Sequence, residues 1–408
     1  MDDTQTPARD GPPDAGPAAP PGALAGVVVA DFSRVLAGPL ATMLLGDLGA
    51  TVIKVEQPGV GDETRRWGPP FVDGTSTYYL SINRNKRSVA LDLGSPAGRA
   101  DAATLASRAD VVVENLRPGR MAAFGLDEPT VRASNPGVVY CSISGFGAGA
   151  GADLPGYDFV VQAMGGLMSI TGPEDGPPTK VGVAVADVLT GLHACIGILA
   201  ALEARHATGV GQLVEVNLLS SLLASLVNQG SAYASGGVVP TALGNHHPSI
   251  APYETLRAAD GPLAVAVGND RQFRSLCTAL GLAPLADDPR FADNGRRVAN
   301  RQVLAAALED ALARYDVAHW VAVLGPAGVP CGPVNNLAGA FELAAGLGLA
   351  PVTSMTGADG ESVAQLSNPI HLASTPVRYE RPPPGLGADD GDVLRWLHDD
   401  RPGRDEPV

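Results

Sequence analysis

One carboxylate stands alone in an apolar stretch of the chain that runs from Lys180 to Leu202. Asp187 follows a run of alternating small and apolar residues, and it precedes fifteen residues that carry no charged side chain. The apolar residues after it recur at the spacing of a buried helix, and Asp favours helix starts because its side chain accepts free backbone N–H groups. The helix dipole favours negative charge at this end, so we expect the Asp187 carboxyl to stay ionised.

Two roles fit an ionised carboxylate in this setting. A carboxylate in a nearly apolar, glycine-lined environment is what nucleophilic carboxylate catalysis requires. The simpler alternative is that Asp187 only caps a core helix. This stretch alone favours the cap, because most Asp residues at helix starts do nothing more.

Charge is unevenly distributed along the 408 residues. The formal net charge of −15 argues against a nucleic-acid partner, because phosphate backbones require a basic face. Basic residues nevertheless gather in the N-terminal third, which predicts contact with a small phosphorylated ligand or, alternatively, a solvated and salt-paired surface. They are Arg65, Arg66, Arg84, Lys86, Arg87, Arg117 and Arg120. The chain has only three lysines, Lys54, Lys86 and Lys180.

The elements that must position these residues alternate between strand and helix. Strands are predicted over 26–31, 51–56, 88–93, 111–114 and 138–144, with helices up to about Leu48 and over 96–108. This order is typical of an α/β fold whose parallel sheet has helices on both faces and binds ligands at the carboxyl ends of its strands. No GxGxxG sequence follows the first strand, so an NAD(P)-binding oxidoreductase is a weaker alternative.

Composition predicts how the chain is divided and where it resides. We expect a disordered tail over 1–23, a large domain over 24–216, a linker helix over 217–240, a small α/β domain over 241–327 and a C-terminal return over 328–408. The four cysteines form no CxxC pair, which indicates free thiols in a reducing cytoplasm. We expect neither a signal peptide nor a membrane span, since the apolar segment after Asp187 is short and contains His193.

Several stretches in order resemble the class III CoA-transferase family, which also contains the 2-methylacyl-CoA racemases. The matching segments are 31–39, 46–56, 83–88, 113–119, 156–158, 182–191, 209–212 and 328–334. The resemblance implies a Rossmann-like large domain with a smaller α/β domain, and a homodimer of two interlocked rings. It implies an enzyme that uses a CoA thioester and a carboxylic acid as substrates, without a tightly bound cofactor or a metal.

The resemblance assigns the nucleophile to Asp187. Its carboxylate would attack an acyl-CoA, possibly of the succinyl type, and a mixed anhydride would collapse to an aspartyl-CoA thioester. The incoming acid would then take the CoA through a second anhydride. Water must be kept out during these steps, which the apolar surroundings favour. The residues implied in CoA binding are Leu36, Ala37, Gln57, Asn83, Arg84, Asn85, Lys86, Asn115, Leu116, Arg117, Ile143, Ser144, Gly145 and Phe146.

Racemisation is the closest competing reaction. Racemases of this family have a Gly-His-Asp sequence whose His acts as the second acid/base, whereas this chain has Tyr157 there. A phenol with a reference pKa near 10 suits that task poorly, so transfer is favoured. Tyr157, His246 and His247 are candidates for substrate contact, and the two histidines are alternatively ordinary loop residues. The sequence does not name the acids.

Overall fold

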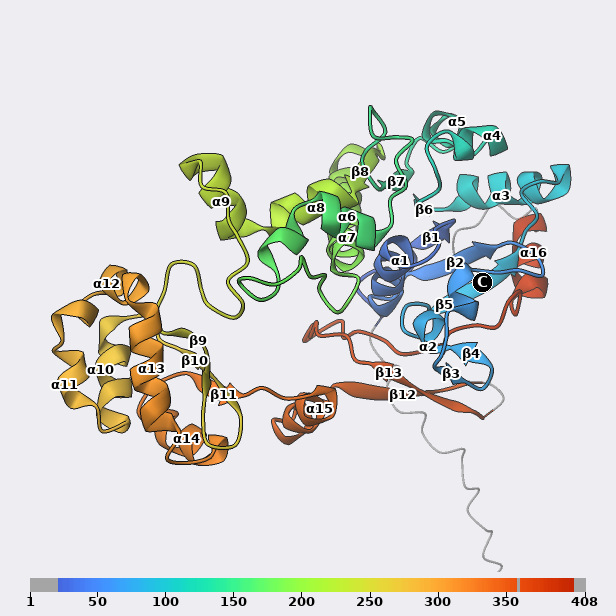
Figure 1. Cartoon of the computed structure of the whole chain (residues 1–408). Coiled ribbons are helices and arrows are strands. Elements are labelled where there is room, and N and C mark those ends of the chain that lie inside the picture. Colours follow the sequence, from blue (N-terminus) through green and yellow to red (C-terminus); the bar gives the residue numbers. More distant parts are fainter. Residues whose placement is uncertain (1–20, 358–359, 400–408) are drawn as a thin grey trace, which may run out of the picture. The chain divides into compact units, whose positions relative to one another are not determined.

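The computed structural model describes residues 21–357 and 360–399. Residues 1–20 of the predicted tail therefore lie outside the described residues. The chain divides into two compact units, each of which is described by itself (Figure 1). Unit 1 comprises the chain up to Ser142, the segment Ala194–Glu215 and the chain from Ser354 onward. Unit 2 comprises Ile143–His193 and Val216–Thr353. The chain crosses between the units four times.

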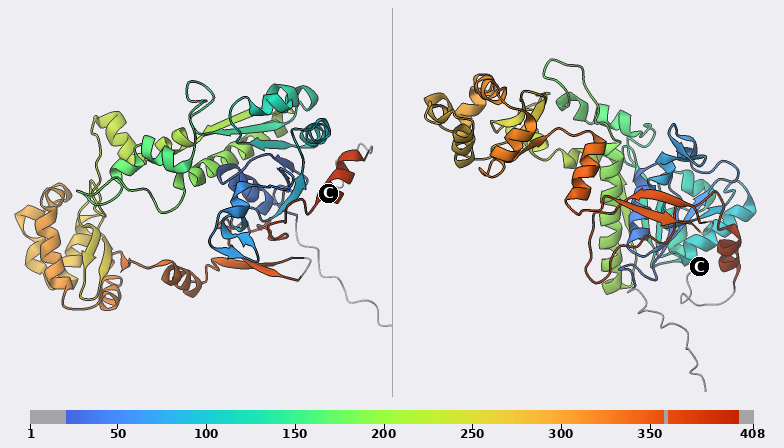
Figure 2. Two further views of the ribbon diagram at one scale, coloured as in Figure 1. Left: turned by 45° about the vertical axis from the view of Figure 1, so that its right-hand side comes forward. Right: turned by 90° about the horizontal axis from the view of Figure 1, so that it is seen from below.

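Unit 1 is built on a sheet with the strand order β5-β2-β1-β6-β7-β8 (Figures 1 and 2). Its strands are β1 Val28–Asp31, β2 Thr51–Glu56, β5 Lys86–Ala90, β6 Val111–Glu114, β7 Val139–Ser144 and β8 Leu213–Asn217. Neighbours from β5 to β7 pair in parallel. The predicted α/β class with a parallel sheet is therefore confirmed. Strand β5 begins two residues earlier than expected.

Helices pack against this sheet through apolar residues. Helix α1, Ala37–Asp47, contacts β1, β2 and β6. Helix α3, Pro96–Arg108, begins where the sequence predicts, because Ser95 accepts the N–H of Gly98 at 3.0 Å and Pro96 occupies the first turn. Helix α16, Asp390–His398, lies beside α3 and brings the C-terminal segment into the same core (Figure 1).

The remaining elements of unit 1 are short. They are η1 Glu63–Arg66, β3 Phe71–Val72, β4 Thr75–Ser76, α2 Thr77–Leu80, α4 Arg120–Phe124, α5 Glu128–Ser134 and β13 Ser362–Leu366. Strand β13 pairs with β12, Val352–Thr356, whose first two residues belong to unit 2.

Helix α7, Val185–Thr208, is the longest helix of the described chain and contributes residues to both units. Its length and composition would allow it to cross a membrane, contrary to the expectation that this segment is too short. The helix also has buried positions that are typical of a core helix, and 44% of its most apolar window is buried. They include Ala194, Cys195, Ile198 and Leu202.

Unit 2 contains a three-stranded sheet, β11-β10-β9, covered by helices. Its elements are α6 Asp158–Met164, η2 Leu167–Ile170, α8 Leu218–Ser225, α9 Val227–Gly236, β9 Tyr253–Arg257, β10 Pro262–Ala266, α10 Asp270–Ala279, α11 Ala283–Ala286, η3 Pro289–Phe291, α12 Asn294–Ala299, α13 Arg301–Leu312, α14 Val317–Leu324, β11 Cys331–Pro333 and α15 Leu337–Gly346. The strands pair antiparallel and share one apolar core with α10, α13 and α14. All four cysteines are unpaired, as expected.

Candidate active site

Asp187 lies in the first turn of α7 but does not begin it. The helix starts two residues earlier, at Val185, and the side chain that caps it comes from α6. Asp158 Oδ1 accepts the backbone N–H groups of Ala186 at 2.8 Å and Asp187 at 3.3 Å. The prediction that Asp187 caps the helix is therefore wrong. Its own carboxyl is left available for chemistry.

The electrostatic setting of Asp187 also differs from the prediction. Burial, and then the negative charge of Asp158, raises the pKa of Asp187 to about 7. The helix dipole favours the charged form, but here desolvation outweighs it. A pKa raised in this way favours the protonated carboxyl, contrary to the expectation that burial beside a helix start leaves Asp187 ionised. Once ionised, such a group is a more basic nucleophile than an ordinary aspartate.

The predicted nucleotide-lining turn, Asn83–Lys86, is buried in unit 1 and held by its own side chains. Arg84 makes two bonds to the Asp47 carboxylate, at 2.9 and 2.6 Å. Asn85 has a left-handed backbone, φ 59°, and its amide donates to Asp47 Oδ1 at 2.8 Å. Asn83 donates to the carbonyl oxygen of Tyr79 at 2.9 Å and accepts from Lys86 Nζ at 3.0 Å.

Lys86 is fully buried and its ammonium group is occupied by internal oxygens. Besides Asn83, it donates to Asp31 Oδ2 at 3.1 Å and to the carbonyl of Pro39 at 2.9 Å. Burial lowers the pKa of Lys86 to about 8, which leaves it charged at neutral pH. Burial alone would raise the pKa of Asp31, but Lys86 and Lys54 outweigh it and hold that pKa at about 2. Lys86 therefore supports the turn, and its three internal acceptors occupy the ammonium group that would otherwise meet a phosphate.

A second buried lysine, which the sequence reading left without a role, extends this polar network. Lys54 Nζ donates to Asp62 Oδ2 at 2.9 Å and to the carbonyl of Ser33 at 2.9 Å. Burial opposes the charge of Lys54, yet Asp62 and the neighbouring carboxylates raise its pKa. The two lysines lie in neighbouring parallel strands, Lys54 in β2 and Lys86 in the edge strand β5, and the scarcity of lysine in the sequence was the available signal.

The other predicted CoA-contact residues of unit 1 differ in exposure. Leu36 and Ala37 are buried at the start of α1. Gln57 and Arg117 are exposed, and Leu116 is half-buried. Asn115 ties two loops together, because it accepts the N–H of Arg34 at 2.8 Å and donates to the carbonyl of Arg34 at 2.7 Å. Gln57 and Arg117 are thus the members of this set that face solvent.

In unit 2, the segment Ile143–Phe146 is fixed by a close approach of two glycines. A Cβ on Gly145 would lie 2.4 Å from the Cα of Gly156, so neither position accepts a side chain without movement. Ile143 is buried, and Ser144 Oγ accepts the N–H of Gly147 at 3.0 Å. Tyr157 is 58% exposed and directly precedes α6.

The two candidate histidines of unit 2 are engaged in the loop that precedes β9. His246 Nε2 lies 2.9 Å from a carboxylate oxygen of Glu254, whose side chain is almost fully buried. Burial raises the pKa of Glu254, although His246 opposes this. His247 Nδ1 accepts the N–H of Ser249 at 3.0 Å, and its ring lies 5.2 Å from that of Tyr253.

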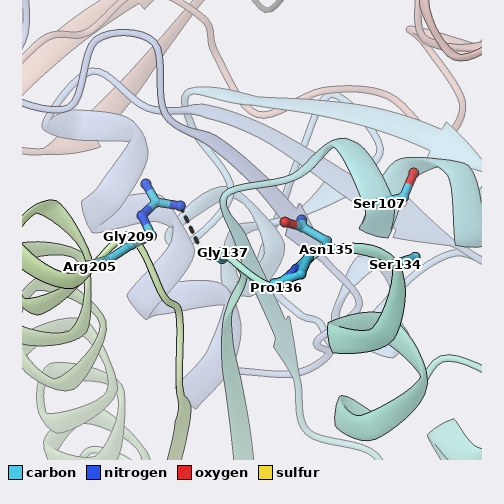
Figure 3. Close-up of a pocket in the computed structure, with 7 residues that line it drawn as sticks. All are labelled: Ser107, Ser134, Asn135, Pro136, Gly137, Arg205 and Gly209. Carbon is cyan, nitrogen blue, oxygen red and sulfur yellow. Dashed lines mark hydrogen bonds between the residues drawn. The ribbon is translucent and has the colours of Figure 1, made fainter.

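A polar cavity of about 510 Å³ opens at the amino edge of the sheet in unit 1 (Figure 3). Arg205 points into it and donates to the carbonyl of Gly137 at 3.2 Å, as Figure 3 shows. The cavity lies at the amino ends of the strands. Asn115 and the loops that follow β1 and β6 lie at the opposite, carboxyl ends, where ligands of parallel sheets gather. Within residues 21–357 and 360–399, no cluster of His, Cys, Asp or Glu could hold a metal ion.

Comparison with known proteins decides the family. The sequence profile of CoA-transferase family III matches residues 24–390. This chain belongs to CoA-transferase family III. Succinate–glutarate CoA-transferase of Agrobacterium fabrum is 43% identical over 385 residues, which are 92% of this chain and 95% of that protein. Acetyl-CoA:oxalate CoA-transferase of Acetobacter aceti is 40% identical over 370 residues, which are 90% and 93% of the two chains.

Solved structures agree with this assignment. The crystal structure of a CAIB/BAIF family protein from Brucella suis superposes with a TM-score of 0.83 at 41% identity, over 92% of this chain and 100% of that one. The chain is a class III CoA-transferase, whose substrates are a CoA thioester and a carboxylate. The relatives named above are transferases, so the racemase alternative is not favoured.

Proposed function

We propose that this class III CoA-transferase moves CoA from a succinyl-type donor to a free carboxylic acid through a thioester on Asp187. The observation that carries the proposal is the Asp187 carboxyl in the first turn of α7, with a pKa raised to about 7. Similarity to an enzyme named succinate–glutarate CoA-transferase supports a dicarboxylic donor and acceptor.

The reaction consists of four balanced acyl transfers. The Asp187 carboxylate attacks the thioester carbonyl, the C–S bond breaks, and a mixed anhydride and a CoA thiolate form. The thiolate attacks Cγ of Asp187, which releases the donor acid as a carboxylate and leaves the aspartyl-CoA thioester. The acceptor carboxylate then attacks Cγ and expels the thiolate, which finally attacks the acceptor acyl carbon and frees the Asp187 carboxylate. No net proton is consumed.

CoA binding in this proposal depends on the turns of unit 1. The buried side chains of Asn83–Lys86 hold the shape of a turn that we propose to support the nucleotide site. Gln57, Asn115 and Arg117 meet the polar parts of CoA, and Arg117 is exposed and able to meet a phosphate. Ile143–Phe146, in unit 2, is a further segment that we propose to contact CoA. The loop with His246 and His247 meets the acceptor acid, together with Tyr157.

We also propose a homodimer, because large apolar side chains are exposed on two helices and the chain beside them. Ile196 and Leu192 on α7 are 63% and 42% exposed, and Leu337 on α15 is 80% exposed, followed by Leu347 at 67%. Large exposed apolar side chains of this kind mark interaction sites, and a second copy is the partner proposed here. Four free thiols fit a reducing compartment, and we propose the cytoplasm.

The test combines turnover with trapping of the intermediate. Purified protein is incubated with succinyl-CoA and a panel of dicarboxylic acids, and new thioesters are identified by mass spectrometry. With donor alone, we expect a CoA adduct on the peptide that contains Asp187. Asp187→Ala should lose both adduct and transfer, whereas Asp175→Ala, in an exposed turn of the same unit, should keep them. Full transfer by Asp187→Ala would refute the mechanism.

A further inference from the structure

The backbone that leads into the nucleophile is held by one face of helix α6. Asp158, the first residue of α6, accepts the N–H groups of Ala186 and Asp187 through Oδ1, at 2.8 and 3.3 Å. An α-helix leaves its first N–H groups without partners inside the helix, so α7 obtains these bonds from a side chain of another element. The peptide N–H of the nucleophile itself is thereby fixed.

Gln162 holds the same segment at its other end. It lies one helical turn after Asp158, so the two side chains share a face of α6. Its side chain is fully buried; Oε1 accepts the N–H of Val181 at 2.9 Å, and Nε2 donates to Asp158 Oδ2 at 2.7 Å. Nε2 also lies 3.4 Å from the carbonyl oxygen of Val183. The pair thus contacts the chain at residues 181, 183, 186 and 187.

We propose that Asp158 and Gln162 form a clamp that positions the nucleophile, with Asp158 also tuning its reactivity through its charge. This inference rests on the proposed role of Asp187. Asp158 and Gln162 are positioning residues, because they act through the backbone and the field around Asp187. Neither is assigned contact with substrate.

A cap alone does not explain a carboxylate at position 158. Asn and Ser cap helices about as well as Asp, and they add no charge. A carboxylate beside Asp187 opposes the ionisation of the nucleophile, and it is the charged group that, after burial, raises the pKa of Asp187. That cost has a use in catalysis, because a more basic carboxylate is a stronger nucleophile toward a thioester.

Other charged groups on the elements near Asp187 are few within unit 2. Helix α8, which packs against α6, carries no ionisable side chain over Leu218–Ser225. Lys180 is exposed and its Nζ donates to the carbonyl of Val181 at 3.1 Å. His193 lies on α7 itself, almost two turns beyond Asp187. Asp158 is therefore the residue to change in order to alter the charge at this site.

The experiment separates the charge of Asp158 from its hydrogen bonds to Ala186 and Asp187. Asp158→Asn keeps an oxygen that can accept the two N–H groups but removes the charge. We expect the acidic limb of its profile of kcat/KM against pH to move about one unit toward lower pH. Asp158→Ala removes both the charge and the accepted hydrogen bonds. We expect its kcat to fall about 100-fold, because small misplacements of reacting groups have effects of this size. Its KM for succinyl-CoA should stay within about threefold of the parent value.

A double variant tests the clamp itself. In Asp158→Asn an amide N–H faces the Gln162 amide, so D158N/Q162E restores that bond with donor and acceptor exchanged and keeps an acceptor for the N–H of Val181. We expect it to regain kcat relative to D158N. Asp175→Asn, an exposed carboxyl in a turn of the same unit, should leave both kcat and the pH profile unchanged.

The outcomes distinguish this inference from the proposed function. Wild-type kcat in D158A, together with an unmoved acidic limb in D158N, would overturn the clamp while the CoA adduct on Asp187 still formed. Failure of the proposed function would show instead as turnover by Asp187→Ala without an adduct. If D158A does not fold, two other results decide. They are the shift of the acidic limb in D158N and the recovery of kcat in D158N/Q162E.

Discussion

Replacing Asp187 by Asn should make the protein more stable at alkaline pH, although it removes activity. The structure raises the pKa of Asp187 from 3.8 to about 7. The folded protein therefore holds the proton more tightly than the unfolded chain. The stability that this proton provides is fully present below the ordinary pKa and is lost as the pH rises through about 7. Asn lacks the titration and escapes the loss.

The magnitude follows from the size of the shift. About three units at about 1.36 kcal/mol each give an upper limit of about 4 kcal/mol over the whole range. Asp187 is partly exposed, so solvent screening reduces this to about 2 kcal/mol. We expect the free energy of unfolding of Asp187→Asn, relative to the parent, to rise by about 1–2 kcal/mol between pH 5 and pH 8.

Urea unfolding at the two pH values, at one fixed protein concentration, measures the difference. Asp175→Asn is the matched control, because it removes an exposed carboxyl twelve residues earlier in the same unit. A relative stability of Asp187→Asn that stays constant from pH 5 to pH 8 would refute the reasoning, since it would mean that the carboxyl titrates alike in the folded and unfolded chains.

Three further variants test other features. Lys86→Met should lower the free energy of unfolding in urea by about 3–5 kcal/mol, because it removes the ion-pair partner of the buried Asp31 carboxylate. The exposed control Lys180→Met should change that free energy by under about 0.5 kcal/mol. Equal losses in the two variants would contradict the network. Gly145→Ala should lower the free energy of unfolding by about 1–3 kcal/mol, because its Cβ would meet Gly156. The control Gly149→Ala has open space around it and should leave stability unchanged. Equal stability of the two variants would argue against the close approach. Ile196→Glu should halve the mass that light scattering measures for the proposed homodimer, and Val303→Glu, at an exposed position on α13, is the control. A mass unchanged by Ile196→Glu would exclude this face.

Much of the sheet could be predicted because its signals are local. Strand β2 over 51–56, helix α3 over 96–108 and strand β6 over 111–114 have the predicted bounds. The strands are largely apolar, and the helix has a capping Ser just before it and a Pro in its first turn. The predicted linker helix over 217–240 is instead two helices, α8 and α9. Val227 has a φ of 43°, which no apolar pattern reveals. Strand β9, Tyr253–Arg257, was not predicted, because it is defined by its pairing with β10 and not by a local pattern.

The site divides in the same way. Asp187 stands out by its isolation in the sequence, but its cap could not be predicted, because Asp158 lies 29 residues earlier and the two meet only in the folded unit. The pKa of Asp187 is raised by burial and by that neighbour, neither of which the sequence reveals. Lys86 illustrates the converse: its position in the sequence suggested a ligand contact, and only the fold reveals its three internal partners.

The burial of two lysines has a practical consequence for chemical labelling. Lys54 and Lys86 are fully buried, and Lys180 is the remaining lysine of the sequence and is exposed. Amine-reactive dyes and cross-linkers need an accessible amine, so among lysine side chains they should modify Lys180. That residue lies seven positions before the nucleophile, directly before the segment that Gln162 contacts. A single fluorophore attached there, without any engineered cysteine, would report on the chain that leads to Asp187 during turnover.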